Sequence, residues 1–157
     1  MTLRPVTNED SEALLRLVGD CYAEYEGCVV DLEVEERPLL APADAYDQFW
    51  VLEEDGRVVG SVAMVIHDET RVELKKMYLE AGLRGTGRAT RLLAAVLYQA
   101  VMMAATEVEL WSDTRFERAH RFYEREGFLR TGRTRELNDP SGTTEFHFVR
   151  RLGGMPK

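Results

Sequence analysis

The chain has 157 residues, with 20 basic and 28 acidic side chains, so its formal charge at neutral pH is −8. Its length fits one domain, and 45% hydrophobic residues exclude a disordered chain or a miniprotein that depends on disulfides. We therefore expect one domain over residues 1–157. The negative charge argues against a nucleic-acid partner, because phosphate binding depends on net or clustered positive charge.

Targeting and redox signals are few. The longest apolar stretch, residues 92–105, is shorter than the roughly 20 residues that cross a bilayer, and residues 1–5 do not read as a signal peptide. Cys21 and Cys28 cannot form a disulfide framework, and no histidine lies near them to complete a metal site. The sequence therefore predicts a cytoplasmic protein with no membrane partner and no metal.

The first part of the chain predicts strands around one clear helix. Thr7 and Asp10 have the spacing of a helix-capping pair before an amphipathic run, and Asp55-Gly56 between apolar runs is typical of a hairpin turn. The elements expected here are strand 2–5, helix 7–25, a short helix 41–48, and strands 49–53 and 58–66.

The second part predicts a strand, a glycine-rich turn, a helix and a strand, followed by a further helix and a hairpin. Apolar residues recur at helical spacing after Arg88, and Gly127 has the place of a helix C-cap. The elements expected here are strand 71–79, helix 88–104, strand 108–111, helix 115–126, and strands 128–137 and 143–152.

Charge is distributed unevenly along the chain. Residues 9–54 hold fourteen acids and two arginines, a balance of −12. Residues 71–91 hold six basic and two acidic side chains, a balance of +4. The middle of the chain could therefore receive an anion, and the acidic first third a ligand of opposite charge.

The glycine-rich turn at residues 79–91 is the most informative segment. Gly85 and Gly87 leave backbone N–H groups unobstructed, and the following helix adds its free amides and positive dipole end, which together suit a pyrophosphate. Arg84, Arg88 and Arg91 add positive charge. Neither a Rossmann fingerprint nor a P-loop is present, and a tight turn without a ligand is the alternative.

Two segments form recognisable motifs, Arg-Gly-Thr-Gly-Arg-Ala at residues 84–89 and Phe122-Tyr123 followed by Gly127-Phe128. The first fits the Q/R-x-x-G-x-G/A signature of the GNAT superfamily of acyl-CoA N-acyltransferases, and the second is similar to the later helix-end pattern of that family. The order of elements agrees with that family from residue 2 to about residue 152. The resemblance implies an α/β (α+β) fold with a mixed, mostly antiparallel sheet of about seven strands and about four helices.

The resemblance also implies acetyl-CoA as co-substrate. Its pyrophosphate would lie on the turn, and its pantetheine arm would add like a strand along Met77 and Leu79. One departure is Phe116, where many members carry an asparagine that contacts CoA. The cofactor residues expected are Met77, Tyr78, Leu79, Arg84, Gly85, Thr86, Gly87, Arg88, Ala89 and Thr90.

Acyl transfer to an amine needs a base and help for the departing thiolate. By resemblance, Glu73 is the candidate general base and Tyr123 stabilises the leaving group. The alternatives are a surface glutamate paired with Lys75 or Lys76, and a tyrosine of the apolar core. The three histidines are expected to be structural or surface residues: His67, His120 and His147.

The predicted function is acetyl-CoA-dependent N-acetylation of a primary amine, by direct attack in a ternary complex. The acidic first third favours a small or cationic acceptor, although an acidic face that only keeps the protein in solution is as consistent with the sequence. A catalytically silent acyl-CoA-binding regulatory module is the alternative function, and a homodimer is left open.

Overall fold

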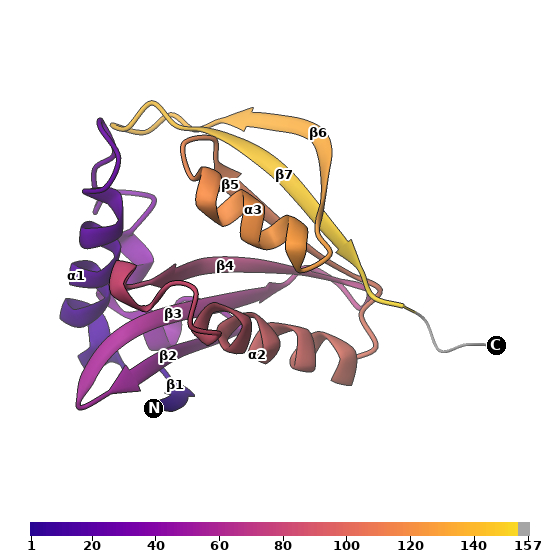
Figure 1. Cartoon of the computed structure of the whole chain (residues 1–157), viewed down its shortest axis with the longest axis horizontal. Helices are drawn as coiled ribbons and strands as arrows, with labels where there is room; N and C mark the ends of the chain where they lie inside the picture. Colours follow the sequence, from indigo (N-terminus) through magenta and orange to yellow (C-terminus); the bar gives the residue numbers. More distant parts are fainter. Residues whose placement is uncertain (154–157) are drawn as a thin grey trace.

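The computed structural model describes residues 1–153. Within them, a seven-stranded sheet in the order β1-β2-β3-β4-β5-β7-β6 is flanked by three α-helices and four short 3-10 helices (Figure 1). The strands are β1 (Thr2–Pro5), β2 (Gln48–Glu54), β3 (Arg57–Ile66), β4 (Arg71–Leu79), β5 (Glu107–Asp113), β6 (Leu129–Glu136) and β7 (Thr144–Arg151). The α-helices are α1 (Ser11–Tyr22), α2 (Arg88–Met102) and α3 (Glu117–Arg125).

The predicted mixed, mostly antiparallel sheet is confirmed, and so are both hairpins. Asp55 and Gly56 both have positive φ, as the tight β2–β3 turn requires. The predicted helix over residues 41–48 is wrong. This region forms two 3-10 turns, Arg37–Leu40 and Pro42–Asp44, each with a proline in its first turn, where proline is tolerated. No longer helix follows, because β2 already begins at Gln48, which pairs with Met64 of β3.

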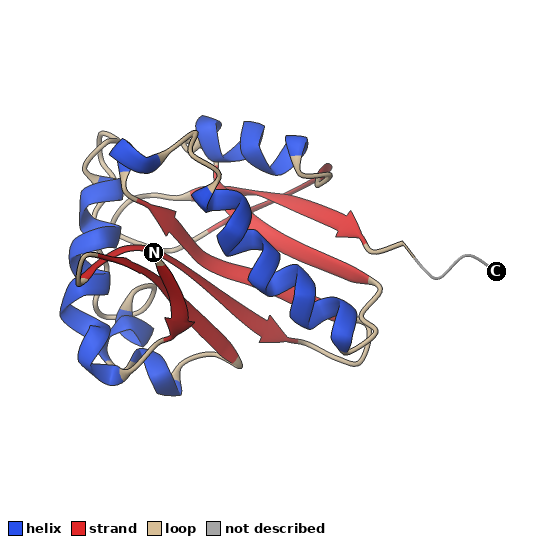
Figure 2. Ribbon diagram, turned by 60° about the horizontal axis from the view of Figure 1, so that its bottom comes forward, coloured by secondary structure: helices blue, strands red, loops and turns tan. Residues whose placement is uncertain are grey.

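The helices cover both faces of the sheet. Leu14, Leu17 and Val18 of α1 pack with side chains of β2 and β3 on one face. On the other face, α2 and the buried side of α3 pack over β3, β4, β5 and β7 in the larger apolar cluster, and Figure 2 shows α2 lying across the strands. Among residues 1–153, no helix is long and apolar enough to cross a membrane.

Within residues 1–153 the sheet has one parallel pair of strands, β4 and β5, and it opens between them. Residues 71–73 of β4 pair with residues 107–109 of β5, and the pairing ends there. Beyond it β4 is irregular, because Lys76 has a φ of 50° and its carbonyl accepts a hydrogen bond from the Ser61 hydroxyl at 2.7 Å. The later parts of β4 and β5 therefore separate in the middle of the sheet.

Candidate active site

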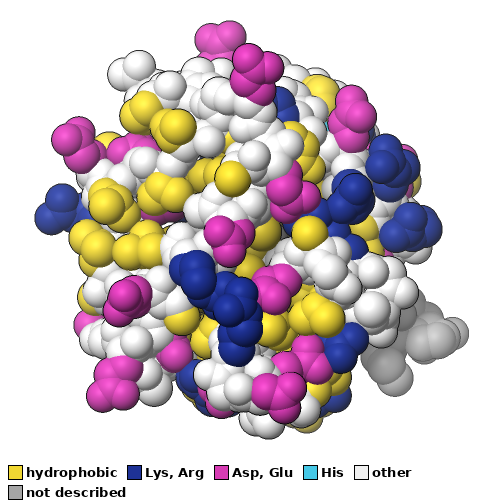
Figure 3. All heavy atoms as spheres, turned by 60° about the vertical axis from the view of Figure 1, so that its left-hand side comes forward, with side chains coloured by type: hydrophobic (Ala, Val, Ile, Leu, Met, Phe, Trp, Pro, Cys, Tyr) yellow, Lys and Arg dark blue, Asp and Glu magenta, His cyan; other side chains and the backbone are white. Residues whose placement is uncertain are grey.

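A cavity of about 600 Å³ lies where β4 and β5 separate. Residues 73–79 of β4 and residues 111–113 of β5 form two of its walls, and the end of α1, one side of α3 and the β6–β7 hairpin complete it. Its size is typical of a small-molecule site. Figure 3 views the molecule from the side of α1, where acidic and basic side chains surround apolar ones.

The turn that leads into α2 presents unused hydrogen-bond donors. Gly85 and Gly87 have φ values of 77° and 86°, and a Cβ added at either would meet nothing within 4 Å. The first helical bond runs from Arg91 N to Gly87 O at 3.1 Å. Within residues 1–153, the N–H groups of residues 85–90 have no protein acceptor, so this turn is chemically suited to an anion.

The side chains of the turn are mostly engaged elsewhere. Arg84 forms a two-bond ion pair with Glu24 at 2.5 and 2.7 Å, and Arg88 does the same with Glu54 at 2.8 and 2.6 Å. Thr86 donates its hydroxyl hydrogen bond to the Leu83 carbonyl, and Thr90 donates to Glu126 at 3.1 Å. The turn thus offers mainly backbone N–H groups, and the charges of Arg84 and Arg88 are largely neutralised.

Positive charge at the cavity comes instead from α3. Three exposed arginines of this helix, Arg118, Arg121 and Arg125, line the cavity, and none forms an ion pair within the described residues. None of the three is among the cofactor residues expected from the sequence. Their spacing of three and four residues, which places them on one helical face, is the signal that could have found them.

Residues 77–79 form the wall of β4 beside the opening. Met77 and Leu79 belong to the apolar cluster under α2, whereas Tyr78 packs on the α1 face, as strand alternation requires. The Leu79 carbonyl accepts contacts from the Cys21 thiol at 3.6 Å and from Arg84 at 3.4 Å. All three residues line the cavity, next to the turn.

Glu73 lines the cavity at the last position of β4 that pairs with β5, and its side chain is only 9% exposed. Its Oε1 lies 2.8 Å from His67 Nε2, and its Oε2 lies 3.5 Å from Lys75 Nζ. Lys76 contacts Glu36 at 3.2 Å and not Glu73. The carboxylate is thus held from the side of the β3–β4 turn and reaches the cavity.

Tyr123 belongs to both the core and the cavity wall. Its ring packs against Phe128 and Phe148 at centroid distances of 5.8 and 6.0 Å. Its hydroxyl has no hydrogen-bond partner among residues 1–153, although the residue lines the cavity. Burial raises the pKa of the Tyr123 phenol well above its ordinary value, so it is a hydrogen-bond donor at neutral pH.

Phe116, at the start of α3, closes the cavity toward α1. Its ring centroid lies 4.8 Å from that of Tyr25 and 6.1 Å from that of Tyr22. Where the resemblance implies an asparagine amide, this chain therefore has aromatic contacts with the end of α1 and the residues that follow it.

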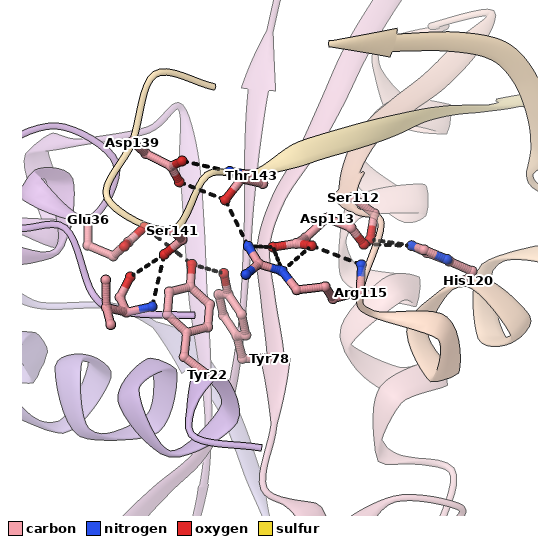
Figure 4. Close-up of polar contacts among 11 residues, drawn as sticks. Tyr22, Glu36, Tyr78, Ser112, Asp113, Arg115, His120, Asp139, Ser141 and Thr143 are labelled. Carbon is pink, nitrogen blue, oxygen red and sulfur yellow. Dashed lines mark hydrogen bonds and ion pairs between the residues drawn. The ribbon is translucent and has the colours of Figure 1, made fainter. Parts of the chain in front are cut away.

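Two groups of hydrogen-bonded polar side chains lie along the cavity, one beside α1 and one between β5 and the β6–β7 hairpin (Figure 4). Tyr22 lies 3.1 Å from the Tyr78 hydroxyl and 3.3 Å from Glu36. A second chain of contacts joins β5 to the β6–β7 hairpin: Asp113 binds Arg115, Arg115 donates to Thr143 at 3.1 Å, and Thr143 donates to Asp139 at 2.7 Å. Ser141 bonds the backbone N and O of Val29 at 2.9 and 3.2 Å, which ties this hairpin to the loop after α1.

The acidic side chains that line the cavity come from several separate segments of the chain. Only two of the fourteen acids in residues 9–54 line it, and several others form ion pairs elsewhere, such as Asp10 and Glu53 with Arg4. Two acids of the lining, Glu35 and Asp139, have no ion-pair partner within the described residues. The acids that line the cavity are Glu35, Glu36, Glu73, Asp113, Asp139 and Glu145.

Comparison with known proteins identifies relatives of this chain. A family model described as an acetyltransferase (GNAT) domain matches residues 45–130. The chain is 31% identical to the uncharacterised N-acetyltransferase YjgM of Escherichia coli over 135 residues, which cover 80% of each protein. It is 41% identical to an uncharacterised N-acetyltransferase of Mycobacterium tuberculosis over 78 residues, which span about half the length of each.

Two further likenesses bear on the acceptor and on the fold. N-acetylaspartate synthetase of Homo sapiens is 40% identical over 85 residues, covering 54% of this chain and 28% of that protein. A crystal structure of an acetyltransferase from Streptococcus agalactiae superposes with a TM-score of 0.81 at 22% identity, covering 96% of this chain and 98% of the other. At that identity the likeness shows the fold alone.

Proposed function

Because this chain belongs to the GNAT acetyltransferase family, we propose that it transfers the acetyl group of acetyl-CoA to a primary amine in the cavity between β4 and β5. The observation that carries the proposal is the set of six free amides at residues 85–90, at the entrance of α2. We propose further that residues 1–157 act as one domain.

The cavity fits acetyl-CoA in charge and in shape. The free amides would hold the pyrophosphate, and Arg118, Arg121 and Arg125 supply positive charge on the facing helix. Beyond Glu73 the edge of β4 no longer pairs with β5, so an extended pantetheine chain can follow Met77 and Leu79 as an added strand. This path leads from the turn toward Glu73.

Transfer is a direct displacement in this proposal. The amine nitrogen attacks the thioester carbon, the new C–N bond forms, the C–S bond breaks, and the sulfur leaves as a thiolate. Glu73 takes the proton that the amine loses, because its carboxylate reaches the cavity at the point where the strands begin to separate. Tyr123 donates a hydrogen bond to the thiolate as charge develops on sulfur.

We propose a cationic acceptor over a neutral or an acidic one. Six carboxylates line the cavity, and Glu35 and Asp139 have no ion-pair partner among residues 1–153 to neutralise them. An amino-acid acceptor is the second candidate, because the relative named N-acetylaspartate synthetase matches over 85 residues.

A screen of amines tests the proposed function. The full-length protein with acetyl-CoA is offered polyamines, aminoglycosides, amino acids including aspartate, and peptide N-termini, while thiol release and the mass of the product are measured. We expect one cationic class to raise thiol release above the amine-free rate and to gain one acetyl group. Tight acetyl-CoA binding with no acetylated amine would instead support the silent binding module.

Steering by charge predicts a salt effect. With acetyl-CoA kept saturating, we expect kcat/KM for the best cationic amine to fall steeply as salt rises from ~0.05 to ~0.5 M, because exposed charges are screened within about 10 Å at 0.1 M. Glu35→Gln should flatten this dependence, whereas Glu26→Gln, a change outside the cavity lining, should not. If kcat/KM of the unmodified protein did not change with salt, charge would not steer the acceptor into the cavity.

A further inference from the structure

His67 is the closest polar partner of the proposed base. Its Nε2 lies 2.8 Å from Glu73 Oε1. The two side chains differ in their access to water, since the Glu73 side chain is 9% exposed and that of His67 is 33% exposed. His67 thus offers a proton accepted by Glu73 a more exposed route to water.

The β3–β4 turn fixes His67 in this place. Val65 pairs with Glu73 across the two strands, so His67, one residue beyond the end of β3, is the diagonal neighbour of Glu73 on the same face. The backbone N–H groups of His67 and Asp68 both donate to the Arg71 carbonyl, at 3.0 and 3.4 Å. The Asp68 carboxylate in turn accepts from the N–H groups of residues 70 and 71 at 2.8 and 2.9 Å.

The other groups around Glu73 are poor proton acceptors or are themselves buried. Lys75 is a cation, and so is Arg71, which lies 3.6 Å from Glu109. The Glu109 carboxylate lies within 4.8 Å of both Glu73 and His67 but is 11% exposed. Tyr46 is near enough to interact electrostatically with Glu73, and burial raises the pKa of its phenol. The last titratable neighbour is the buried His147. Its Nε2 lies 3.9 Å from Glu109 Oε2, and burial lowers the pKa of the His147 imidazole.

We propose that His67 is a positioning and relay residue that carries the acceptor's proton from Glu73 to solvent. The amine loses a proton to the Glu73 carboxylate, and the resulting carboxylic acid passes it to His67 Nε2 in the tautomer that carries its own proton on Nδ1. The imidazolium then loses one proton to water, and proton exchange with water restores the carboxylate and the neutral imidazole. Imidazole suits this step because it takes up and releases protons near neutral pH. The inference rests on the proposed role of Glu73 as base.

A divalent metal ion held by His67, Glu73 and Glu109 is the competing interpretation of this cluster. Each carboxylate already has a basic side chain within 4 Å, Lys75 for Glu73 and Arg71 for Glu109. These cations would repel a metal ion and compete for the same oxygens, so the relay fits the charges better.

Two substitutions of His67 separate proton transfer from hydrogen bonding. His67→Gln keeps an N–H that can donate to Glu73 but cannot carry a proton, whereas His67→Ala leaves space for added imidazole. We expect both variants to lower kcat by about 10-fold or more with KM values nearly unchanged. Imidazole should restore the alanine variant and leave the unmodified enzyme and Glu73→Gln unaffected.

The outcomes distinguish the relay from the proposed function. Full activity in His67→Gln, or a loss in His67→Ala that imidazole does not repair, would overturn the relay and leave Glu73 as base. A wild-type rate in Glu73→Gln would show that Glu73 is not the base, and the relay would fall with it. If a chelator abolished the activity of the unmodified enzyme and a divalent ion restored it, the metal interpretation would be favoured and the relay overturned.

Discussion

Tyr123→Phe is expected to lower kcat by about 10- to 1,000-fold, because one hydrogen bond to a developing negative charge is lost. The affinity for acetyl-CoA should change little, since the hydroxyl acts on charge that exists only late in the reaction. The Phe ring keeps the contacts with Phe128 and Phe148, so the core should remain intact.

The chemistry also limits what Tyr123 can do. A free phenol titrates near pKa 10 and a thiol near 8.5, so full proton transfer to the thiolate is uphill by roughly 2 kcal/mol. Burial raises the pKa of Tyr123 further, which makes the transfer still less favourable. We therefore expect a hydrogen bond to the thiolate and not complete protonation.

Steady-state kinetics with the best amine, together with acetyl-CoA titration calorimetry, check this prediction. Tyr98→Phe is the matched control, because Tyr98 is on α2, is 63% exposed and does not line the cavity. A Tyr123→Phe enzyme as fast as the unmodified one would return Tyr123 to a purely structural role.

Gly87→Val is expected to abolish the stabilisation that acetyl-CoA gives to the fold. At 100 times its Kd, acetyl-CoA should add about 2.7 kcal/mol to the free energy of unfolding, which is a clear rise in Tm. Gly87 has a φ of 86°, which a β-branched residue strongly disfavours, and the space beside it is open in the protein. The valine would therefore strain the turn and occupy the place of the pyrophosphate.

The readout is the Tm difference with and without acetyl-CoA, because the variant also lowers the Tm of the free protein. Gly82→Val is the matched control. Gly82 lies in the same turn region with open space beside it, but without a positive φ. A normal ligand-induced rise in Gly87→Val would mean that acetyl-CoA binds elsewhere.

Local features of the sequence predicted much of the fold and the glycine turn before α2. Gly85 and Gly87 before a helix, and Asp55-Gly56 between apolar runs, depend on neighbouring residues only, and both turns form as expected. The short helix predicted over residues 41–48 is wrong, because the end of this segment belongs to the sheet: Gln48 pairs with Met64, and Asp47 accepts a hydrogen bond from Ile66 N at 2.7 Å. These contacts depend on residues of β3 and could not be predicted from the segment itself.

Contacts between distant residues could not be predicted. The sequence suggested that Arg84 and Arg88 contribute free positive charge, but their partners Glu24 and Glu54 lie 60 and 34 residues away. The pairing of His67 with Glu73 depends on strand register and on the side of the sheet that each faces. The charge distribution along the sequence indicated residues 9–54 as the source of acids at the site, but four of the six acids that line the cavity lie outside that range.

Backbone amide NMR during titration with acetyl-CoA tests the central claim most directly, because the proposed cofactor site consists of N–H groups. We predict that the largest shifts, and new protection from hydrogen exchange, occur at residues 85–90, where no protein acceptor is present, with smaller shifts at Met77 and Leu79. Shifts concentrated elsewhere, or amides of residues 85–90 that stay unchanged at saturation, would contradict the account.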